Sequence, residues 1–207
     1  MQAPIAYSQT GQLTAIVERM LEPLRADSRI AVHVETLRPQ RPFPFPWSFF
    51  RFFDAFPESA HLVPPALEPL TLSGDEDFDL VILTYQVWYL SPSLPMTAFL
   101  KSPEGRALVA GKPVVTLVAC RNMWLSAQET MKRLIADAGG KLRDHIAFTD
   151  QGHPLATFIT TPRWVLTGKR NAWLGLPPAG VAPAEIAGAA RFGHALAEAL
   201  EQNQEAG

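Results

Sequence analysis

The chain has 207 residues, of which 47% are hydrophobic and 18% are charged, and its formal net charge is -2. This length can bury one sizeable core, so we expect a single domain over residues 1–207. A near-neutral chain without a run of Lys or Arg has no electrostatic footprint for nucleic acid, and no apolar run reaches the about 18 residues of a membrane span. One cysteine and five scattered histidines provide neither an internal disulfide nor the ligand spacing of a metal site. We therefore expect a cytoplasmic protein with small-molecule partners.

The first half of the chain alternates strand and helix signals. A short apolar stretch that ends at Tyr7 predicts the first strand, in which Pro4 cannot donate a backbone hydrogen bond. Apolar residues at helical spacing from Leu13 to Leu24 predict a helix packed on a sheet. Residues 29–37 alternate and predict a second strand, and the unbroken apolar run at 80–83 is typical of a strand buried in a parallel sheet.

The second half continues the alternation. Residues 111–120 predict a further buried strand, and Ser126 and Glu129 at capping-box spacing predict the start of a helix that ends at Gly139. Residues 144–150 predict a last strand, and residues 183–202 predict a closing helix. Right-handed crossovers place the helices on both faces of a parallel sheet. The order of elements therefore predicts a three-layer α/β domain.

Two segments interrupt this alternation. Residues 40–72, after the second strand, form an insertion rich in Phe and Pro, and residues 151–182 predict a long loop before the last helix. The insertion places five phenylalanines in the stretch from Trp47 to Phe56, which is too many for one solvated face. Three interpretations remain open: a helix that covers the core, a lid over a substrate, or a contact between two copies of the chain.

The loops that follow the strands are the candidate site, because ligands of an open parallel sheet bind beyond the carboxyl ends of its strands. The first loop offers Ser8 and Thr10 as hydroxyl donors, and Gly11 lets the backbone approach a ligand closely. The free N–H groups of the following helix complete a cradle for a phosphate without a basic side chain. The alternative is that Thr10 only caps the helix. The glycine-rich fingerprints G-x-G-x-x-G and G-x-x-x-x-G-K-[ST] are both absent from the sequence.

Two further loops converge on the same edge of the sheet. The second, at 84–95, carries Tyr85, Trp88 and Tyr89, and the third, after residue 120, carries Arg121 and Trp124. Flat side chains at the end of a strand suit a flat ligand. An anion cradle beside two aromatic loops is the arrangement that flavin mononucleotide (FMN) needs. Arg121 either stabilises the negative charge of a reduced flavin or is an ordinary solvated or ion-paired residue.

Three of these stretches carry a resemblance to a known family. The loop SQTGQL at 8–13, the block at 77–100 and the strand at 111–120 resemble the flavodoxin-like superfamily. The resemblance implies a doubly wound sheet of five parallel strands in the order 2-1-3-4-5, with the FMN phosphate on the first loop and the flavin ring between the other two. The family pattern has a third hydroxyl residue where Leu13 stands here. The residues that the resemblance assigns to the cofactor are Ser8, Gln9, Thr10, Gly11, Gln12, Leu13, Thr84, Tyr85, Gln86, Val87, Trp88, Ala119, Cys120, Arg121, Asn122 and Trp124.

The insertion carries a narrower resemblance. The first loop together with PFPWSFFRFFDAFPE at 44–58 is similar to the dialkylresorcinol condensing enzymes of aryl-polyene and dialkylresorcinol biosynthesis, in which the flavodoxin-like member is regarded as an aromatase. This resemblance implies an aromatase that oxidises a cyclic diketone. The site residues favour an FMN-dependent oxidoreductase that acts on a small cyclic or quinone-like substrate, with NAD(P)H as a candidate reductant that has no fingerprint of its own in the sequence. Tyr85, Tyr89 and His153 are the candidate catalytic residues. The alternative is a non-catalytic electron carrier or a scaffold that docks on a ketosynthase partner.

Overall fold

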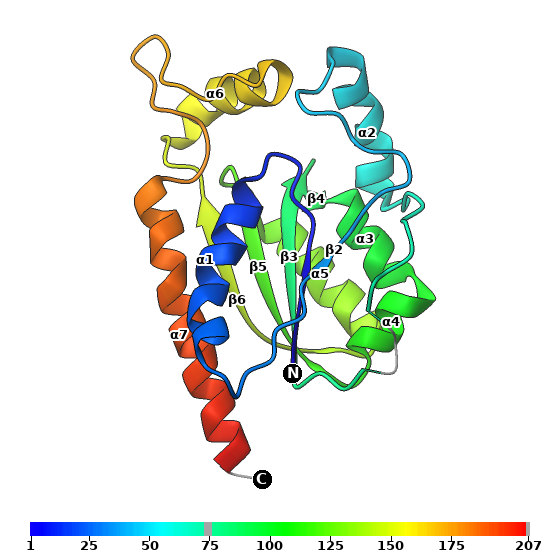
Figure 1. Ribbon diagram of the computed structural model, residues 1–207. Helices are drawn as coiled ribbons and strands as arrows, with labels where there is room; N and C mark the ends of the chain where they lie inside the picture. Colours follow the sequence, from blue (N-terminus) through cyan, green and yellow to red (C-terminus); the bar gives the residue numbers. More distant parts are fainter. Residues whose placement is uncertain (73–75, 206–207) are drawn as a thin grey trace.

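The computed structural model describes residues 1–72 and 76–205 of the chain. Strands and helices alternate along it (Figure 1). In chain order the elements are β1 (Gln2–Ala6), α1 (Gln12–Ala26), β2 (Glu35–Thr36), α2 (Phe49–His61), β3 (Leu80–Trp88), β4 (Ser91–Pro92), α3 (Leu94–Lys101), α4 (Pro103–Val109), β5 (Pro113–Cys120), α5 (Leu125–Asp137), β6 (Lys141–Thr149), α6 (Pro154–Thr167) and α7 (Pro183–Glu205).

The sheet has the predicted topology. Its strands follow the order β2-β1-β3-β5-β6 and pair in parallel, and the short β4 pairs antiparallel with the end of β3. With β4 set aside, this is the predicted order 2-1-3-4-5. Helices α1 and α7 cover one face of the sheet, and α3, α4 and α5 cover the other (Figure 1). The prediction of a three-layer α/β fold with this strand order is therefore confirmed.

Strand β3 lies at the centre of the sheet and contributes to the core on both faces. Leu80 and Ile82 pack in the apolar cluster formed with α1 and α7, while Val81, Leu83 and Tyr85 pack in the cluster on the opposite face. All five side chains are buried, as expected for an unbroken apolar run. The two clusters hold the sheet between its helix layers, so the carboxyl ends of the strands are fixed relative to one another.

The second strand is much shorter than the predicted 29–37. Regular pairing with β1 is confined to Glu35–Thr36. On this side of β1 the Gln2 N–H donates to the Ala31 carbonyl, and the carbonyls of Gln2 and Ala6 accept from the N–H groups of His33 and Leu37. Pro4 lies between Gln2 and Ala6 on the same side and has no N–H to offer. The missing donor accounts for the interruption of the ladder.

The expectation of a long loop at 151–182 is wrong, because this segment contains helix α6. His153 caps the helix through Nδ1, which accepts from the Leu155 N–H at 3.3 Å, and Gly168 ends it in the left-handed region at φ 72°. The several threonines of the helix and its internal Pro162 have poor helix propensity, which hid the helix in the sequence. Tertiary packing therefore decides that this segment is helical.

Helix α2 has a side-chain cap at its N-terminus, whereas the cap predicted for α5 is absent. Ser48 caps α2, because its Oγ accepts from the Arg51 N–H at 3.4 Å. Helix α5 begins at Leu125, so Ser126 lies inside it and the predicted capping box with Glu129 does not form. The predicted helix after β5 is present, but it begins two residues earlier than the capping box predicted, with Trp124 and not Ser126 at the N-cap position.

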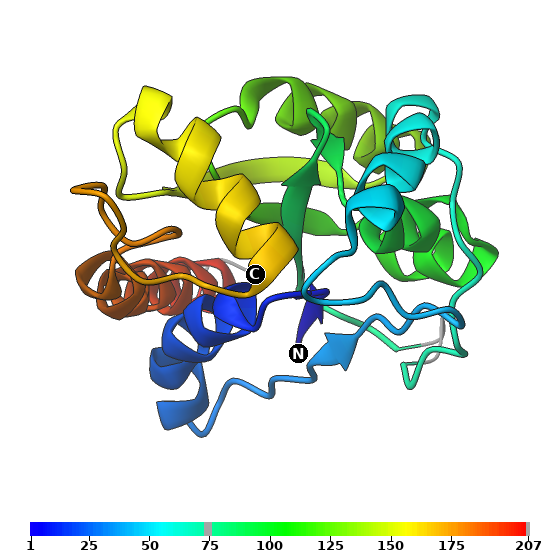
Figure 2. The same cartoon turned by 90° about the horizontal axis from the view of Figure 1, so that it is seen from above.

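Helices α2 and α6 lie above the carboxyl ends of the strands, and we call this pair the roof (Figures 1 and 2). They come from the two segments that interrupt the alternation, 40–72 and 151–182. The backbone N–H of Trp47, just before α2, donates to the Val165 carbonyl of α6 at 2.9 Å and joins the two segments. The insertion is therefore helical, as one interpretation supposed, but it covers the edge of the sheet and not one of its faces.

The contact between α1 and α7 depends on a glycine. A Cβ on Gly193 would lie 2.0 Å from the Met20 carbonyl oxygen of α1. We expect Gly193→Ala to lower the free energy of unfolding by about 3 kcal/mol, measured by urea denaturation. Gly188→Ala in the same helix is the matched control, because its Cβ would meet only the flexible Arg191 side chain. The control should be neutral or stabilising by about 1 kcal/mol, and equal losses in the two variants would contradict the steric argument.

Candidate functional site

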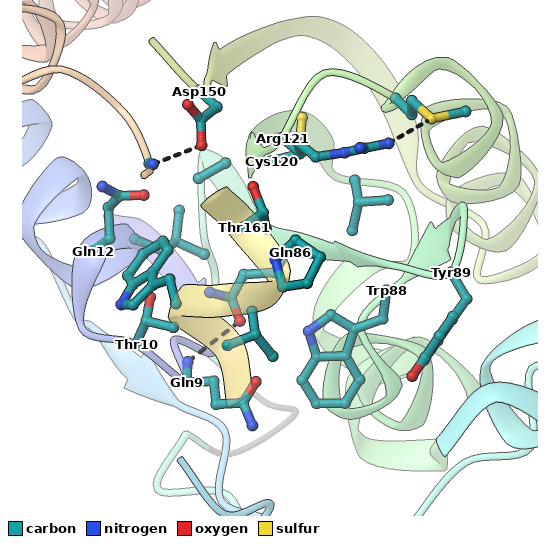
Figure 3. A pocket seen from close by; sticks show the side chains of 18 of the residues that line it. Gln9, Thr10, Gln12, Gln86, Trp88, Tyr89, Cys120, Arg121, Asp150 and Thr161 are labelled. Atoms are coloured by element: carbon teal, nitrogen blue, oxygen red, sulfur yellow. Dashed lines mark hydrogen bonds between the residues drawn. The ribbon is translucent and has the colours of Figure 1, made fainter. Parts of the chain in front are cut away.

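A cavity of about 380 Å³ lies between the carboxyl ends of the strands and the roof (Figure 3). Its mostly apolar walls come from parts of the chain that are far apart in sequence. The lining residues are Gln9, Thr10, Gln12, Leu13, Trp47, Phe52, Gln86, Val87, Trp88, Tyr89, Leu90, Ala119, Cys120, Arg121, Met123, Asp150, Phe158, Thr161, Pro162, Trp164, Val165 and Gly180.

The loop between β1 and α1 brings Thr10 to the cavity. The N-cap of α1 is Gly11, which adopts φ 77° and has open space where a Cβ would stand. No side chain of the described residues caps this helix, so the alternative that Thr10 serves as the cap is wrong. The first backbone bond of α1 runs from the Ala15 N–H to the Gly11 carbonyl at 3.1 Å. The N–H groups of the first turn therefore have no helical acceptor and can bind an anion.

Ser8 and Leu13 of this loop offer no hydroxyl to an anion in the cavity, although their positions in the sequence suggested phosphate contacts. Ser8 lines a groove beside Tyr7, outside the cavity, and its buried hydroxyl has no hydrogen-bond partner among the described residues. Leu13 is fully buried and closes the cavity floor where the family pattern has a third hydroxyl. An anion in the cavity would thus meet one hydroxyl of this loop, that of Thr10, beside the backbone N–H groups.

Gln12 links the first loop to the segment before α7. With its amide oriented to match its neighbours, the Gln12 oxygen accepts from the Val181 N–H at 3.0 Å and from Arg170 Nη2 at 2.8 Å. Arg170 also donates to the Ala179 and Val181 carbonyls, at 2.7 and 2.9 Å. The Gln12 side chain is therefore already hydrogen-bonded within the protein. Its bond to Arg170 holds the guanidinium of that residue near the N-terminus of α1. Sequence reasoning missed Arg170, because it lies in the segment interpreted as a loop.

Thr84 and Tyr85 of β3 lie in the core and not at the cavity. The Tyr85 hydroxyl donates to Gln128 Oε1 at 2.7 Å, and burial raises the pKa of Tyr85 far above its usual value. The Thr84 hydroxyl donates to the Ile5 carbonyl at 3.2 Å. Neither side chain lines the cavity, so the structure does not bring Tyr85 to the place where a catalytic role was expected.

The following residues of β3 do line the cavity. Gln86 Oε1 accepts from the Gln9 N–H at 3.3 Å and ties the first loop to the second. The Trp88 ring packs edge-on against Phe43 and Trp47 of the insertion, with ring centroids 4.8 and 5.4 Å away. Trp88 therefore stands between the sheet and the insertion and forms a flat wall of the cavity.

A tight turn between β3 and β4 places Tyr89 and Leu90 at the cavity. Both residues adopt positive φ, 49° and 65°, in the left-handed region that costs a non-glycine residue about 1–2 kcal/mol. The Tyr89 hydroxyl donates to the Phe52 carbonyl of α2, which anchors the turn to the roof. Burial raises the pKa of Tyr89 well above its usual range, so the phenol stays protonated at neutral pH and cannot act as a base.

The loop after β5 brings Arg121 to the cavity wall. Its guanidinium lies 3.8 Å from the centre of the Phe158 ring of α6, and its Nη2 lies 3.0 Å from Met123 Sδ. Among the residues that the structure describes, no carboxylate lies within salt-bridge distance of Arg121. The interpretation of Arg121 as an ion-paired residue is therefore wrong, whereas its partial exposure is consistent both with a solvated guanidinium and with a charge that faces a ligand.

Cys120 lines the cavity beside Arg121, and its reactivity is suppressed. Burial raises the pKa of the thiol to about 12, although the charge of Arg121 acts in the opposite direction. Because only the thiolate is alkylated, we expect iodoacetamide to modify Cys120 roughly a thousandfold more slowly at pH 8 than an exposed cysteine. The rate should rise with pH and should become normal in urea. Rapid modification of the folded protein at pH 8 would contradict this assignment.

Three further residues predicted for the site lie outside the cavity lining. Asn122 Nδ2 is buried without a partner among the described residues, and the Trp124 ring packs on His145 with centroids 5.5 Å apart. His153 is exposed and is used as the cap of α6. Of the three candidate catalytic residues, the structure thus brings Tyr89 alone to the cavity.

Sequence reasoning missed Asp150, although the predicted last strand ends on it. Its carboxylate is buried and accepts from the Gly152 N–H at 2.8 Å and from the Gly180 N–H at 2.6 Å. Asp150 is the one carboxylate among the described residues that line the cavity. Its position at the carboxyl end of the last strand is the signal that could have identified Asp150. The predicted cofactor site contained the loops after three other strands and did not include the loop after this one.

The roof supplies the remaining wall of the cavity. Trp47 and Phe52 come from the insertion, and Trp164 and Thr161, the latter labelled in Figure 3, come from α6. The Thr161 hydroxyl is buried and has no hydrogen-bond partner among the described residues, so a ligand that fills the cavity could satisfy it. These residues could not be assigned from the sequence, because their contact depends on how the two interrupting segments pack on each other.

Comparison with known proteins identifies the fold. The sequence matches no protein-family model and no curated protein. The structure is similar to a flavodoxin from the domain Archaea, with a TM-score of 0.54 and 13% identity over 97% of this chain and 99% of the other. It is also similar to a flavoprotein in complex with FMN from Lactobacillus acidophilus, with a TM-score of 0.55 and 14% identity over 70% of this chain and 91% of the other. The chain has the flavodoxin-like fold.

The flavodoxin-like topology explains where the cavity lies. After β1 the chain crosses to the face covered by α1, and after β3 it crosses to the opposite face covered by α3. This divergence opens a crevice at the carboxyl ends of the two strands. Within residues 1–72 and 76–205, no group of three or more His, Cys, Asp or Glu side chains is arranged to hold a metal ion. In the same part of the chain, no helix combines the length and the apolar character needed to cross a membrane.

Proposed function

We propose that this flavodoxin-like chain binds FMN and catalyses the oxidation or reduction of a small cyclic or quinone-like compound. The observation that carries the proposal is the roofed cavity at the crevice between β1 and β3, which has a helix N-terminus at one end and aromatic walls along its sides. The similar Lactobacillus flavoprotein is described as a complex with FMN, which supports the choice of cofactor.

The first loop fits the phosphate of FMN. The Thr10 hydroxyl lines the cavity, and the N–H groups of the first turn of α1 have no helical acceptor. A phosphate would accept hydrogen bonds from these donors at the positive end of the helix dipole. The buried Leu13 removes the third hydroxyl of the family pattern, so Thr10 and the backbone N–H groups are the donors of this loop that would hold the phosphate.

The remainder of the cavity fits a planar ring. Its volume of about 380 Å³ falls in the range of small-molecule sites, and Trp88 and Tyr89 supply flat apolar surface. When bound, FMN supplies the hydride or electron transfer, and the protein supplies orientation and charge. Arg121 would offset negative charge that develops on the bound ligands, because no carboxylate of the described residues neutralises it.

Aromatisation of a cyclic diketone removes a hydride and a proton from the substrate. In this proposal the Asp150 carboxylate, which lines the cavity, accepts the proton from the substrate. It takes the role of base that the sequence suggested for Tyr85, Tyr89 or His153. Tyr85 is buried in the core, His153 lies outside the cavity, and burial keeps the Tyr89 phenol protonated. The resemblance of the insertion to the dialkylresorcinol condensing enzymes makes a cyclohexanedione the first substrate to test, and NAD(P)H with a quinone is the second.

The experiment that tests the cofactor is a titration of the purified chain with FMN. We expect the flavin fluorescence to be quenched on binding, with a Kd below about 10 μM. Riboflavin, which lacks the phosphate, should bind more weakly. If FMN leaves both its absorbance and its fluorescence unchanged at about 100 μM, the proposal fails.

The rival function is a non-catalytic electron carrier or a ketosynthase scaffold. A carrier exchanges electrons through an exposed ring edge, whereas Phe52 and Trp164, from the two helices of the roof, line this cavity and would cover part of a bound ring. We therefore favour an enzyme. Repeated turnover of NADPH with a simple benzoquinone, or of a cyclohexanedione with oxygen as the final acceptor, would support this choice. A chain that binds FMN and only passes electrons to a protein partner would support the carrier.

A further inference from the structure

Four of the five phenylalanines of α2 point away from the core, and Phe52 alone of the five lines the cavity. Phe49, Phe50, Phe53 and Phe56 are all at least half exposed, and Phe50 is 79% exposed. The rings of Phe49 and Phe53 lie one turn apart on the helix and contact each other, with centroids 4.8 Å apart. These side chains form one aromatic surface. Water solvates such a surface poorly, so a contiguous patch of this kind marks an interaction site.

Helix α6 also carries its apolar side outward. Leu155, Phe158 and Ile159 follow the spacing i, i+3 and i+4, so they share one side of the helix, and each is more than half exposed. Thr157 and Thr160 are buried on the inner side. Over this first half of α6 the arrangement is the reverse of an ordinary amphipathic helix, which turns its apolar side to the core and its polar side to water. In the second half, by contrast, Trp164 and Val165 line the cavity.

The turn that follows α6 presents two more apolar side chains. Trp173 and Leu174 lie at this turn, and Leu174 is 78% exposed. Arg163 of α6 donates to the Lys169 and Asn171 carbonyls at 3.1 and 3.0 Å, and its guanidinium lies 5.3 Å from the centre of the Trp173 ring. These contacts hold the turn beside α6 (Figure 2). The apolar side chains of α2, α6 and this turn therefore belong to the same end of the molecule.

The charge of the chain is divided unevenly between this end and the rest. Residues 40–72 and 151–182, the two segments that form the roof, contain five Lys or Arg and three Asp or Glu, which gives them a net charge of +2. Because the whole chain has a formal net charge of -2, the remaining residues carry -4. Arg51 and Lys169 are exposed beside the apolar side chains. The segments that form the roof are thus both apolar and basic.

We propose that the roof docks on the surface of an anionic lipid bilayer, with the mouth of the cavity facing the lipid. Phe158 and Leu90 both line the cavity and are exposed, so the mouth opens at this end of the molecule. Apolar side chains from separate elements, a tryptophan at a turn and flanking Lys or Arg are the combination that binds a bilayer interface. A second copy of the chain is a less suitable partner for this surface, because two roofs with the same positive charge repel each other. The proposal does not depend on FMN.

Vesicle flotation of the full chain, without added flavin, tests this proposal. The chain should float with vesicles that contain phosphatidylglycerol, more weakly with vesicles of phosphatidylcholine alone, and less in high salt. The double variant Leu155→Ser with Leu174→Ser should lower the partition coefficient at least about tenfold. Both side chains are more than 70% exposed in the folded chain, so circular dichroism should show an unchanged fold.

A second pair of variants isolates the contribution of charge. Arg51→Gln with Lys169→Gln should weaken binding to anionic vesicles roughly tenfold. Arg106→Gln with Arg143→Gln is the matched control, because it removes the same charge from exposed positions on α4 and β6, outside the roof. The control pair should bind like the natural chain.

Three results would overturn the proposal. They are the absence of flotation with anionic vesicles, an equal loss of binding in the control pair, and a stable dimer in sedimentation that leaves the vesicles unbound. The last result would assign the exposed roof to a contact between copies. None of them would affect the FMN titration, which is carried out without lipid, so the two proposals fail separately.

Discussion

Replacing Trp47 by alanine is expected to lower the free energy of unfolding by about 3–5 kcal/mol. Trp47 is only 5% exposed, and its ring contacts Phe43, Phe52 and Trp88, with centroids 5.7, 6.1 and 5.4 Å away. Its backbone N–H also donates to Val165 of α6. Removing the indole leaves a void at the point where the insertion, β3 and the roof meet. Urea denaturation measures the loss, and limited proteolysis should show earlier cleavage within 40–62.

Phe50→Ala is the matched control for this prediction. Phe50 lies on the same segment, but its ring is 79% exposed, so its removal should change the free energy of unfolding by no more than about 0.5 kcal/mol. If the two variants lose similar amounts of stability, the packing around Trp47 is not what attaches the insertion to the sheet.

Replacing Thr10 by valine is expected to weaken FMN binding about 10- to 100-fold and to leave riboflavin binding unchanged. A hydrogen bond to a charged group contributes about 1.5–3 kcal/mol, and valine has nearly the shape of threonine without its donor. Thr10 is the hydroxyl residue of the first loop that lines the cavity, and it does not serve as the cap of α1. Titrations of both flavins, followed by fluorescence quenching, measure the difference.

Thr14→Val provides the control for Thr10, because Thr14 is exposed on the first turn of α1 and does not line the cavity. It should leave the affinity for both flavins unchanged. If Thr10→Val weakens FMN and riboflavin equally, the side chain acts through packing against the ring, and the first loop is not the phosphate site.

Local patterns were sufficient to predict the fold class. The apolar run of β3 and the helical spacing of Leu13, Ile16 and Met20 in α1 report burial of neighbouring residues, which is a property that a short window of sequence contains. The alternation of strands and helices then allowed few topologies, because crossovers between parallel strands are right-handed. The same reasoning located three of the loops that form the site, since the carboxyl ends of parallel strands share one edge.

Side-chain direction at the end of β3 was not contained in the sequence. A strand buried on both faces has no alternation of apolar and polar residues, so the pattern could not tell whether Tyr85 faces the core or a ligand. The structure places it on the same face as Val81 and Leu83, where Gln128 accepts from its hydroxyl. The catalytic role expected for Tyr85 depended on this undetermined direction.

The sequence by itself determined the α/β layers, the buried strands β3 and β5 with the helices α1, α5 and α7, and the first three loops of the site, because each of these follows from the period of burial along the chain. The roof, Arg170 beside Gln12 and the Asp150 carboxylate between two glycine N–H groups were decided by tertiary structure alone. Helix α6 illustrates the physical reason. Its threonines and Pro162 disfavour a helix locally, and contacts with residues more than a hundred positions away, such as Trp47, stabilise it in the folded chain.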